Sequence, residues 1–298
     1  MADRVAGSAA EGVLSEAVAR LRPRLHRYCA RMMGSAVEGE DVVQDALLKA
    51  AEAWSDVAPV ENPDGWLFRI AHNAALDALR RRARRVELER EGQEDMVAPR
   101  QGDVDPLATR ASLQTLARLP VAQRSAVTLR DVLDFSVEEI AGMLDLSGPA
   151  VKGLLQRGRQ RLAEIAREPG DMRAPQLAPG ERARLETYVA RFNAHDFDAV
   201  RAMLAEDVRL DLVNRLQLRG RDEVAPYFGR YDTATHWRCA AGIVDGKPAV
   251  LMLDAQDGDG RPLYFVTLEW RDDEIVAIRD FLFARYVLES AKVALPVR

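Results

Sequence analysis

The chain has 298 residues, of which 48% are apolar and 30% are charged, and its formal net charge is −5. This length predicts two or three domains, and the ordinary apolar content excludes wholesale disorder. The two cysteines lie far apart without a cysteine–histidine cluster, which argues against a disulfide scaffold or a zinc site. No apolar run approaches the length of a membrane span and no secretory signal precedes the first helix, so a cytoplasmic protein is expected.

Two polar stretches divide the chain into three modules. Residues 86–106 hold seven acidic residues, two prolines and two glycines, which predicts a solvated, flexible linker. Residues 167–180 hold three prolines and two glycines, which predicts a second, stiffer linker. The modules between these linkers are residues 10–85, 107–166 and 181–298.

The first module predicts amphipathic helices. Pro23 is expected to open a helix, because proline suits the first turn. Further along, apolar residues recur at i, i+4, i+8 and i+11 and predict one buried stripe. The members of this stripe are Val43, Leu47, Ala51 and Trp54.

The segment from Gly65 to Arg85 begins with apolar residues at helical spacing and ends with five arginines within six positions. The residues expected to face inward are Trp66, Ile70, Ala74 and Leu79. Favourable interaction with the helix dipole explains one or two arginines at a helix end, but it explains five poorly. The helix dipole therefore leaves most of this basic run unexplained.

The second module predicts a helix-turn-helix between Asp134 and Leu162. Ser136 and Glu139 have the spacing of a capping box, and Ser147 is the expected N-cap of the second helix. That second helix has four basic residues and no acidic one up to its last leucine, and it occupies the recognition position. A merely solvated basic helix is the alternative, which the capped first helix and the short turn disfavour.

The third module begins with predicted helices and continues with predicted strands. Residues 181–212 predict two helices, the second reaching Leu204. Short β-rich runs follow, separated by turns such as Asp245–Lys247, which predict hairpins. Helices followed by an antiparallel sheet make an α+β domain.

Taken together, the two helical modules resemble the extracytoplasmic-function type of the sigma-70 family of bacterial transcription initiation factors. The resemblance is carried by "EDVVQDALLKA", "WLFRIAHNAALDALRRRARR" and "LPVAQRSAVTLRDVLDFSVEEIAGMLDLSGPAVKGLLQRGRQRL", in this order and with a linker before the third. It implies a region 2 helical bundle, a region 4 helix-turn-helix and a subunit that directs promoter-specific transcription initiation.

The resemblance also implies partners, namely core RNA polymerase, through the clamp helices of its largest subunit, and promoter DNA. The residues implied for docking on polymerase are Asp41, Gln44, Asp45 and Leu48. Those implied for the −10 element are Arg69, Asn73, Asp77, Arg80, Arg81, Arg82, Arg84 and Arg85. Those implied for the −35 element are Arg124, Pro149, Lys152, Gln156 and Arg157. One departure from the family is that Gly153–Leu154 stands where a Ser-Arg pair is common.

The third module resembles the SnoaL-like, cone-shaped α+β fold with a curved antiparallel sheet. The segments that carry this resemblance are "YVARFNAHDFDAVRAMLAEDVRLDL", "IVDGKPAVLML" and "LYFVTLEWRDDEIVAIRDF". A subgroup of these sigma factors carries such a domain, which implies regulation through intramolecular contacts. A pocket for an apolar small molecule is one option, and plain core packing is the other. The pocket residues would be Tyr188, Phe192, Trp237, Tyr264 and Phe281.

Catalysis is not expected, and no catalytic residue, metal site or cofactor is predicted. His195–Asp196 invites a general-base interpretation, but an N-cap and turn explain it better. The alternatives are an isomerase- or cyclase-type enzyme with a DNA-binding appendage and an ordinary helix-turn-helix repressor. The region 2 motifs disfavour the repressor, which needs neither polymerase docking nor −10 recognition.

Overall fold

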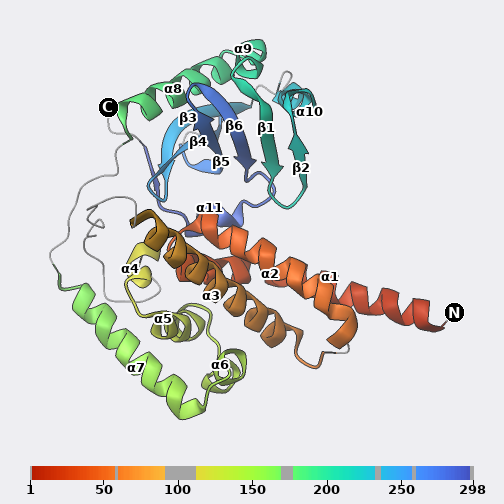
Figure 1. Cartoon of the computed structure of the whole chain (residues 1–298), viewed down its shortest axis with the longest axis vertical. Helices are drawn as coiled ribbons and strands as arrows, with labels where there is room; N and C mark the ends of the chain where they lie inside the picture. The colour runs from red at the N-terminus through yellow and green to blue at the C-terminus, as the bar shows by residue number, and fades with distance from the viewer. Residues whose placement is uncertain are drawn as a thin grey trace. The chain divides into compact units, whose positions relative to one another are not determined.

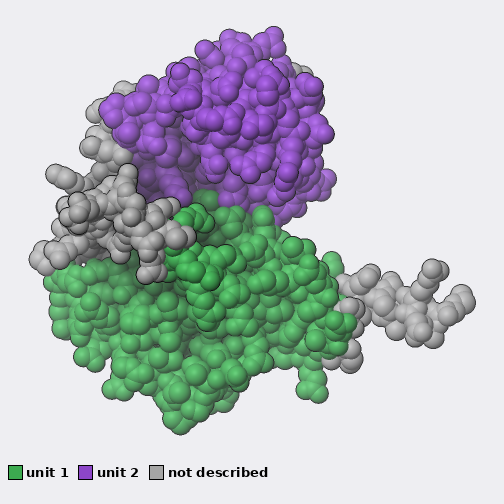
Figure 2. Space-filling view, viewed as in Figure 1, with its two compact units in different colours: residues 1–173 green, residues 174–298 purple. Residues whose placement is uncertain are grey.

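Helices form the first part of the chain, and a sheet with covering helices forms the rest (Figure 1). The computed structural model describes residues 2–57, 60–90, 112–168, 177–231, 236–256 and 260–295. The chain divides into two compact units, Met1–Arg173 and Ala174–Arg298, which Figure 2 shows in different colours. None of the described helices combines the length and apolar composition that crossing a membrane requires.

The first unit begins with three long helices, α1 (Ala2–Met33), α2 (Ala36–Val57) and α3 (Pro63–Arg90). Pro23 lies inside α1, so the prediction that it opens a helix is wrong. Leu21 and Leu25, on either side of it, are fully buried, and this packing keeps the helix continuous despite the missing hydrogen bond.

The apolar stripe of α2 differs from the predicted one at a single position. Val43 and Trp54 are buried as expected, whereas Ala51 is exposed and Ala50 is buried in its place. The third helix continues to Arg90, so its last turn occupies the start of the stretch that the sequence assigns to the acidic linker. The rest of that linker lies outside the described residues.

The helix-turn-helix is confirmed, with the predicted caps at both helix starts. It follows α4 (Leu113–Ala117), α5 (Val121–Val127) and a π-helical turn η1 (Thr128–Val132), and it consists of α6 (Val137–Leu144) and α7 (Gly148–Ile165). At the start of α6, Ser136 Oγ accepts from Glu139 N at 3.1 Å, and Glu139 Oε2 accepts from Ser136 N at 2.7 Å. Ser147 Oγ accepts from the backbone N–H of Ala150 at 3.3 Å and caps α7.

The two helical modules share one hydrophobic core. The rings of Phe68 on α3 and Phe135, just before α6, meet edge to face with centroids 4.8 Å apart. The guanidinium group of Arg24 lies 4.7 Å from the Phe135 ring centroid and donates to Leu133 O at 2.9 Å. The modules that the sequence separates by a linker therefore pack against each other within one unit.

The second unit opens with α8 (Pro179–Asn193) and α9 (Phe197–Arg201) and then forms a sheet that has seven strands among the described residues. The strands are β1 (Leu204–Leu212), β2 (Leu216–Arg219), β3 (Trp237–Val244), β4 (Lys247–Asp254), β5 (Pro262–Arg271), β6 (Glu274–Asp280) and β7 (Val293–Ala294), and their spatial order is β2-β1-β6-β5-β4-β3-β7. Short helical segments follow β2, namely α10 (Arg221–Val224) and η2 (Ala225–Tyr231), and α11 (Tyr286–Ser290) follows β6.

The strand pairings are antiparallel, as predicted, with one exception: β1 pairs with β6 in parallel. The second predicted helix ends earlier than expected, because Leu204 begins β1 and pairs with Ile275 instead of continuing α9. The predicted turn between β3 and β4 is present, with φ values of 50° at Asp245 and 83° at Gly246. Positive φ at both positions matches the twist of a tight hairpin.

Side chains from α8 pack on one face of this sheet and form the core of the second unit. Leu185, Tyr188 and Phe192 are buried there together with residues from the strands. The end of α8 is fixed to β3 by a pair of hydrogen bonds. Asn193 Nδ2 donates to Cys239 O at 2.9 Å, and Cys239 N donates to Asn193 Oδ1 at 2.8 Å.

A buried histidine makes the stability of the first unit depend on pH. His26 is fully buried on α1, with Nε2 2.9 Å from Ala36 O, and burial lowers its pKa to about 4. Because an unfolded histidine titrates near 6.5, the unfolded chain binds an additional proton between pH 6.5 and 4. The free energy of unfolding therefore falls as the pH drops through this window, by about 2 kcal/mol from pH 7 to pH 5 for this group.

Replacing His26 by glutamine keeps a donor for Ala36 O and removes the titration. We expect the free energy of unfolding of His26→Gln to fall by about 2 kcal/mol less between pH 7 and pH 5 than that of the wild type. Denaturant unfolding at the two pH values measures this difference. The pH dependence of the unfolding free energy that remains in the variant belongs partly to His72, because burial also lowers the pKa of His72 to about 4. The same pH dependence in variant and wild type would contradict this role for His26.

Candidate nucleic-acid interface

The polar side of α2 presents the residues implied for docking. Asp41, Gln44, Asp45 and Leu48 are spaced i, i+3, i+4 and i+7, which places them on one face of the helix. Asp41 and Asp45 are exposed and Gln44 is half-buried. Leu48 has an exposed fraction of 63% and supplies an apolar side chain to this otherwise polar face.

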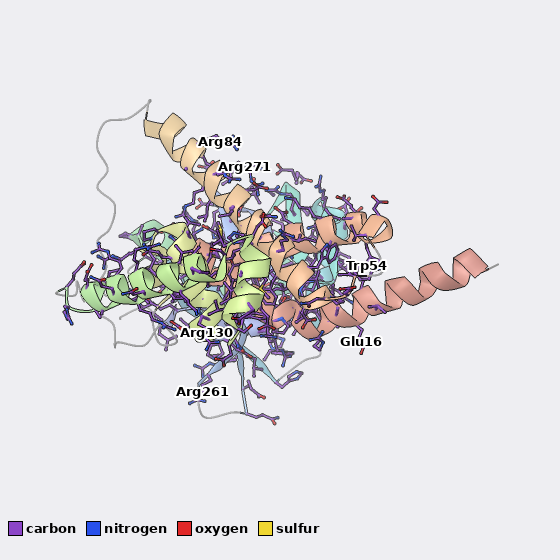
Figure 3. All side chains as sticks on the ribbon, turned by 90° about the horizontal axis from the view of Figure 1, so that it is seen from below. Glu16, Trp54, Arg84, Arg130, Arg261 and Arg271 are labelled. Carbon is purple, nitrogen blue, oxygen red and sulfur yellow. The ribbon has the colours of Figure 1, made fainter. Side chains whose placement is uncertain are left out.

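The arginines of α3 fall on two sides of the helix. Four of the implied DNA contacts share one exposed face of α3, because successive members are four, seven and four residues apart. They are Arg69, Asn73, Arg80 and Arg84. Figure 3 labels Arg84 on the distal half of this helix. Asp77, also implied for DNA contact, already binds cations: its carboxylate lies 3.1 Å from Arg80 Nη1 and 3.5 Å from Lys49 Nζ.

The other arginines of the run point to α2 instead. Arg81 Nη2 lies 3.3 Å from Asp45 Oδ2, and Arg82 Nη1 lies 3.2 Å from Glu38 Oε2. Between the two helices lies a groove of about 310 Å³. Its lining residues are Met33, Glu38, Asp41, Val42, Asp45, Ala78, Arg81, Arg82 and Arg85. Residues implied for polymerase docking thus lie in one groove with arginines implied for −10 DNA contact.

The second helix of the helix-turn-helix exposes the side chains implied for the −35 element. Pro149, Lys152, Gln156 and Arg157 are all exposed, and within the described part of the chain Lys152 and Arg157 form no ion pair. Two later arginines of α7 are engaged: Arg159 binds Asp131 through two nitrogens, and Arg161 lies 3.0 Å from Glu164. Lys152 thus lies in the N-terminal half of α7, the half that enters the major groove in such motifs, and Arg157 lies at the middle of the helix.

Gly153 accommodates the side chain of Arg157. A Cβ atom at position 153 would lie 3.3 Å from Arg157 Nη1, so the guanidinium group lies across the glycine. The departure from the common Ser-Arg pair therefore leaves room for the Arg157 guanidinium group beside the helix backbone.

The position of Arg124 contradicts its predicted role as a −35 contact. Only 6% of this residue is exposed, and its guanidinium group donates to three backbone carbonyls, those of Met32, Ala117 and Leu119. From this position the side chain cannot reach a DNA phosphate. It joins the end of α1 to the start of the second helical module, because those carbonyls belong to segments on both sides of the linker.

Comparisons with known proteins agree with this geometry. Residues 17–85 match the family model for sigma-70 region 2, residues 110–162 match that for sigma-70, region 4, and residues 185–278 match that for a SnoaL-like domain. The chain is 32% identical over 162 residues to RNA polymerase sigma factor CarQ of Myxococcus xanthus, an alignment that covers 53% of this chain and 92% of CarQ.

The chain belongs to the extracytoplasmic-function sigma factors of the sigma-70 family. It directs promoter-specific transcription initiation and carries its SnoaL-like domain fused at the C-terminal side. A relative that aligns with most of this chain is ECF RNA polymerase sigma factor SigG of Mycobacterium tuberculosis (strain ATCC 25618 / H37Rv), 28% identical over 303 residues, which cover 88% of this chain and 79% of SigG. The crystal structure of Mycobacterium tuberculosis extracytoplasmic function sigma factor SigJ aligns over 88% of this chain and 93% of that one, with 21% identity and a TM-score of 0.36.

In the SnoaL-like domain of this sigma factor, four of the five aromatic residues considered for a pocket lie in one cluster. Tyr231 connects them: its ring contacts those of Phe192 at 4.9 Å and Trp237 at 6.5 Å, and these in turn contact Tyr188 and Tyr264. Tyr188, Phe192 and Tyr264 are buried in the core of this domain.

Phe281 does not belong to that cluster. It stacks on Phe265 with ring centroids 4.3 Å apart. Phe265 and Tyr264 are neighbours in β5 and therefore point to opposite faces of the sheet. Phe281 thus contacts the face of the sheet that does not carry the four clustered aromatic side chains.

A buried polar network beside the cluster escaped the sequence analysis. Asp280 is fully buried; its Oδ2 accepts from Tyr227 Oη at 2.7 Å and from Arg230 Nη2 at 3.0 Å. Tyr231 Oη lies 3.2 Å from Tyr264 Oη and 3.5 Å from Tyr227 Oη, which completes a chain of hydroxyl groups. Burial raises the pKa of Asp280 and of the three tyrosines, so the phenols stay protonated donors.

The residues that invite a catalytic interpretation have structural explanations. Asp196 Oδ1 accepts from Ala199 N at 3.1 Å and caps α9, as predicted, and His195 occupies the preceding turn with a φ of 57°. Within the described ranges, no group of three histidine, cysteine or carboxylate side chains is arranged to hold a metal ion.

Proposed function

We propose that this sigma factor docks on the clamp helices of core RNA polymerase through the exposed face of α2, contacts the −10 element with α3 and reads the −35 element with α7. The observation that supports this most is the arrangement of α7: a capped helix-turn-helix presents Lys152, Gln156 and Arg157 on one exposed surface. The docking role of α2 is supported by its spacing, which places the exposed side chains of Asp41, Asp45 and Leu48 on one face.

The C-terminal domain, in this proposal, modulates transcription through contacts with the helical unit and does not act as an enzyme. Four of the five aromatic side chains predicted for a pocket pack in one cluster within the core, which supports a structural role for them. We place the protein in the cytoplasm, where its polymerase partner is.

Run-off transcription with bacterial core polymerase tests this proposal. The full chain is compared with a version ending at Glu168, which retains the helical unit and its own core, on genomic fragments of the source organism. Transcription that depends on the added protein supports the sigma role, and a changed yield after truncation gives the sign of C-terminal control. Absence of transcription and of polymerase binding with both proteins would refute the proposal.

Lys152 provides a sharper test of −35 recognition. If its ammonium group binds a base edge, Lys152→Ala is expected to cost about 1–3 kcal/mol of −35 affinity and to relax the sequence preference at one position. The measurement is holoenzyme binding to the promoter fragment and to a version with a scrambled −35 element. Arg161→Ala is the control on the same helix, because Arg161 is paired with Glu164. Equal losses on both DNAs would reduce Lys152 to a phosphate contact.

A further inference from the structure

The basic run at the end of α3 is divided between two faces of the helix. Three arginines of the run line the groove shared with α2, together with Ala78. They are Arg81, Arg82 and Arg85. Arg80 and Arg84 are four residues apart, in line with Asn73, and do not line the groove. The five arginines therefore have different surroundings.

The groove is balanced in charge. Three guanidinium groups, from Arg81, Arg82 and Arg85, face three carboxylates, from Glu38, Asp41 and Asp45. A phosphate group that approached Arg81 would also approach the carboxylate of Asp45, which is 3.3 Å from that arginine. The repulsion between the two anions makes this side of α3 a poor surface for a nucleic-acid strand.

The same arrangement suits a protein partner. Arg81 and Asp45 are each about half exposed, at 51% and 54%, and a single 3.3 Å contact leaves most donors of the guanidinium group and one carboxylate oxygen available. Asp45 belongs to the proposed polymerase-docking face, and Arg81 holds its carboxylate in place. A partner that presents both acidic and basic side chains can satisfy both groups at once.

We propose that Arg81 and Arg82 belong to the polymerase-docking surface of this sigma factor and not to its −10 DNA-binding surface. This inference rests on the proposed function, because it requires that the α2 face docks on core polymerase. It assigns the groove between α2 and α3 to a polymerase surface that carries charges of both signs. Because Arg80 is paired with Asp77 at 3.1 Å, it leaves Arg84 as the phosphate contact of the run.

The test compares Arg81→Gln and Arg82→Gln with the matched control Arg84→Gln, which removes the same charge at a position that does not line the groove. Two quantities are measured: affinity for core polymerase without DNA, and the salt dependence of holoenzyme binding to the promoter fragment recovered by run-off transcription. We expect Arg81→Gln and Arg82→Gln to weaken polymerase binding about two- to fivefold each and to leave the salt slope unchanged. Arg84→Gln should keep the polymerase affinity and lower the salt slope by about 0.7–0.9.

A double variant checks the ion pair itself. Arg81→Gln combined with Asp45→Asn should weaken polymerase binding less than the product of the two single effects, because each change already breaks the pair. A lowered salt slope in Arg81→Gln, or an unchanged polymerase affinity, overturns the inference. A wild-type protein that fails to bind core polymerase refutes the proposed function itself, before any variant is compared.

Discussion

Replacement of Gly39 by alanine is expected to destabilise the helical unit by about 3 kcal/mol, because α1 and α2 touch at this residue. A Cβ atom at position 39 would lie 2.5 Å from both Cα and N of Ala30. The clash is with main-chain atoms, so no rotamer change relieves it and the two helices must move apart. The intrinsic gain of alanine over glycine in a helix, about 1 kcal/mol, does not offset this cost.

Thermal and denaturant unfolding of Gly39→Ala check the expectation, with a melting temperature lower by roughly 6–12 °C for a unit of this size. Gly142→Ala is the matched control, since a Cβ atom at position 142 on α6 would meet nothing within 4 Å. That variant is expected to gain up to about 1 kcal/mol. If Gly39→Ala were as stable as the control, α1 and α2 could not approach as closely as the structure shows.

Removal of the Arg124 side chain is the second change with a large expected effect. Arg124→Ala deprives three backbone carbonyls of their donor, and we expect a loss of about 3 kcal/mol of unfolding free energy. Arg124→Lys should recover only part of this loss, because an ammonium group lacks the planar fork that reaches several carbonyls at once.

The same variants separate a structural role from a DNA contact. The slope of log affinity against log salt for promoter binding by holoenzyme should be the same for Arg124→Ala and the wild type, whereas loss of a true phosphate contact lowers it by about 0.9. Arg157→Ala is the comparison, since Arg157 is exposed on α7. Arg124 variants with normal stability and a reduced slope would restore the phosphate contact that the structure contradicts.

The sequence predicted most of the fold because its signals are local. The capping box at Ser136 and Glu139 and the N-cap at Ser147 need only a few neighbouring residues, and all three are present. The α+β character of the second unit also followed from short alternating runs and turn residues. The parallel pairing of β1 with β6 did not, because it joins segments some 65 residues apart whose order in the sheet leaves no local signal.

The roles of single charged residues were harder to predict. Arg124 lies in a polar stretch and resembles a surface residue until α1 places Met32 O beside it. Arg81 and Arg84 stand three positions apart in one basic run, and only the packing of α3 against α2 shows that Arg81 meets a carboxylate. The helical period divides such a run into two faces, but it cannot indicate which face is occupied by a neighbouring helix.

The shared core of the two helical modules has a consequence for promoter occupancy. A partner that binds only when the modules are apart has an apparent affinity equal to its intrinsic affinity multiplied by the fraction of separated molecules. If contacts such as those of Phe68 with Phe135 and of Arg124 with Met32 favour the joined state by about 3 kcal/mol, that fraction is roughly one in 150. Interior residues that never touch DNA would then set the concentration at which this sigma factor fills its promoters.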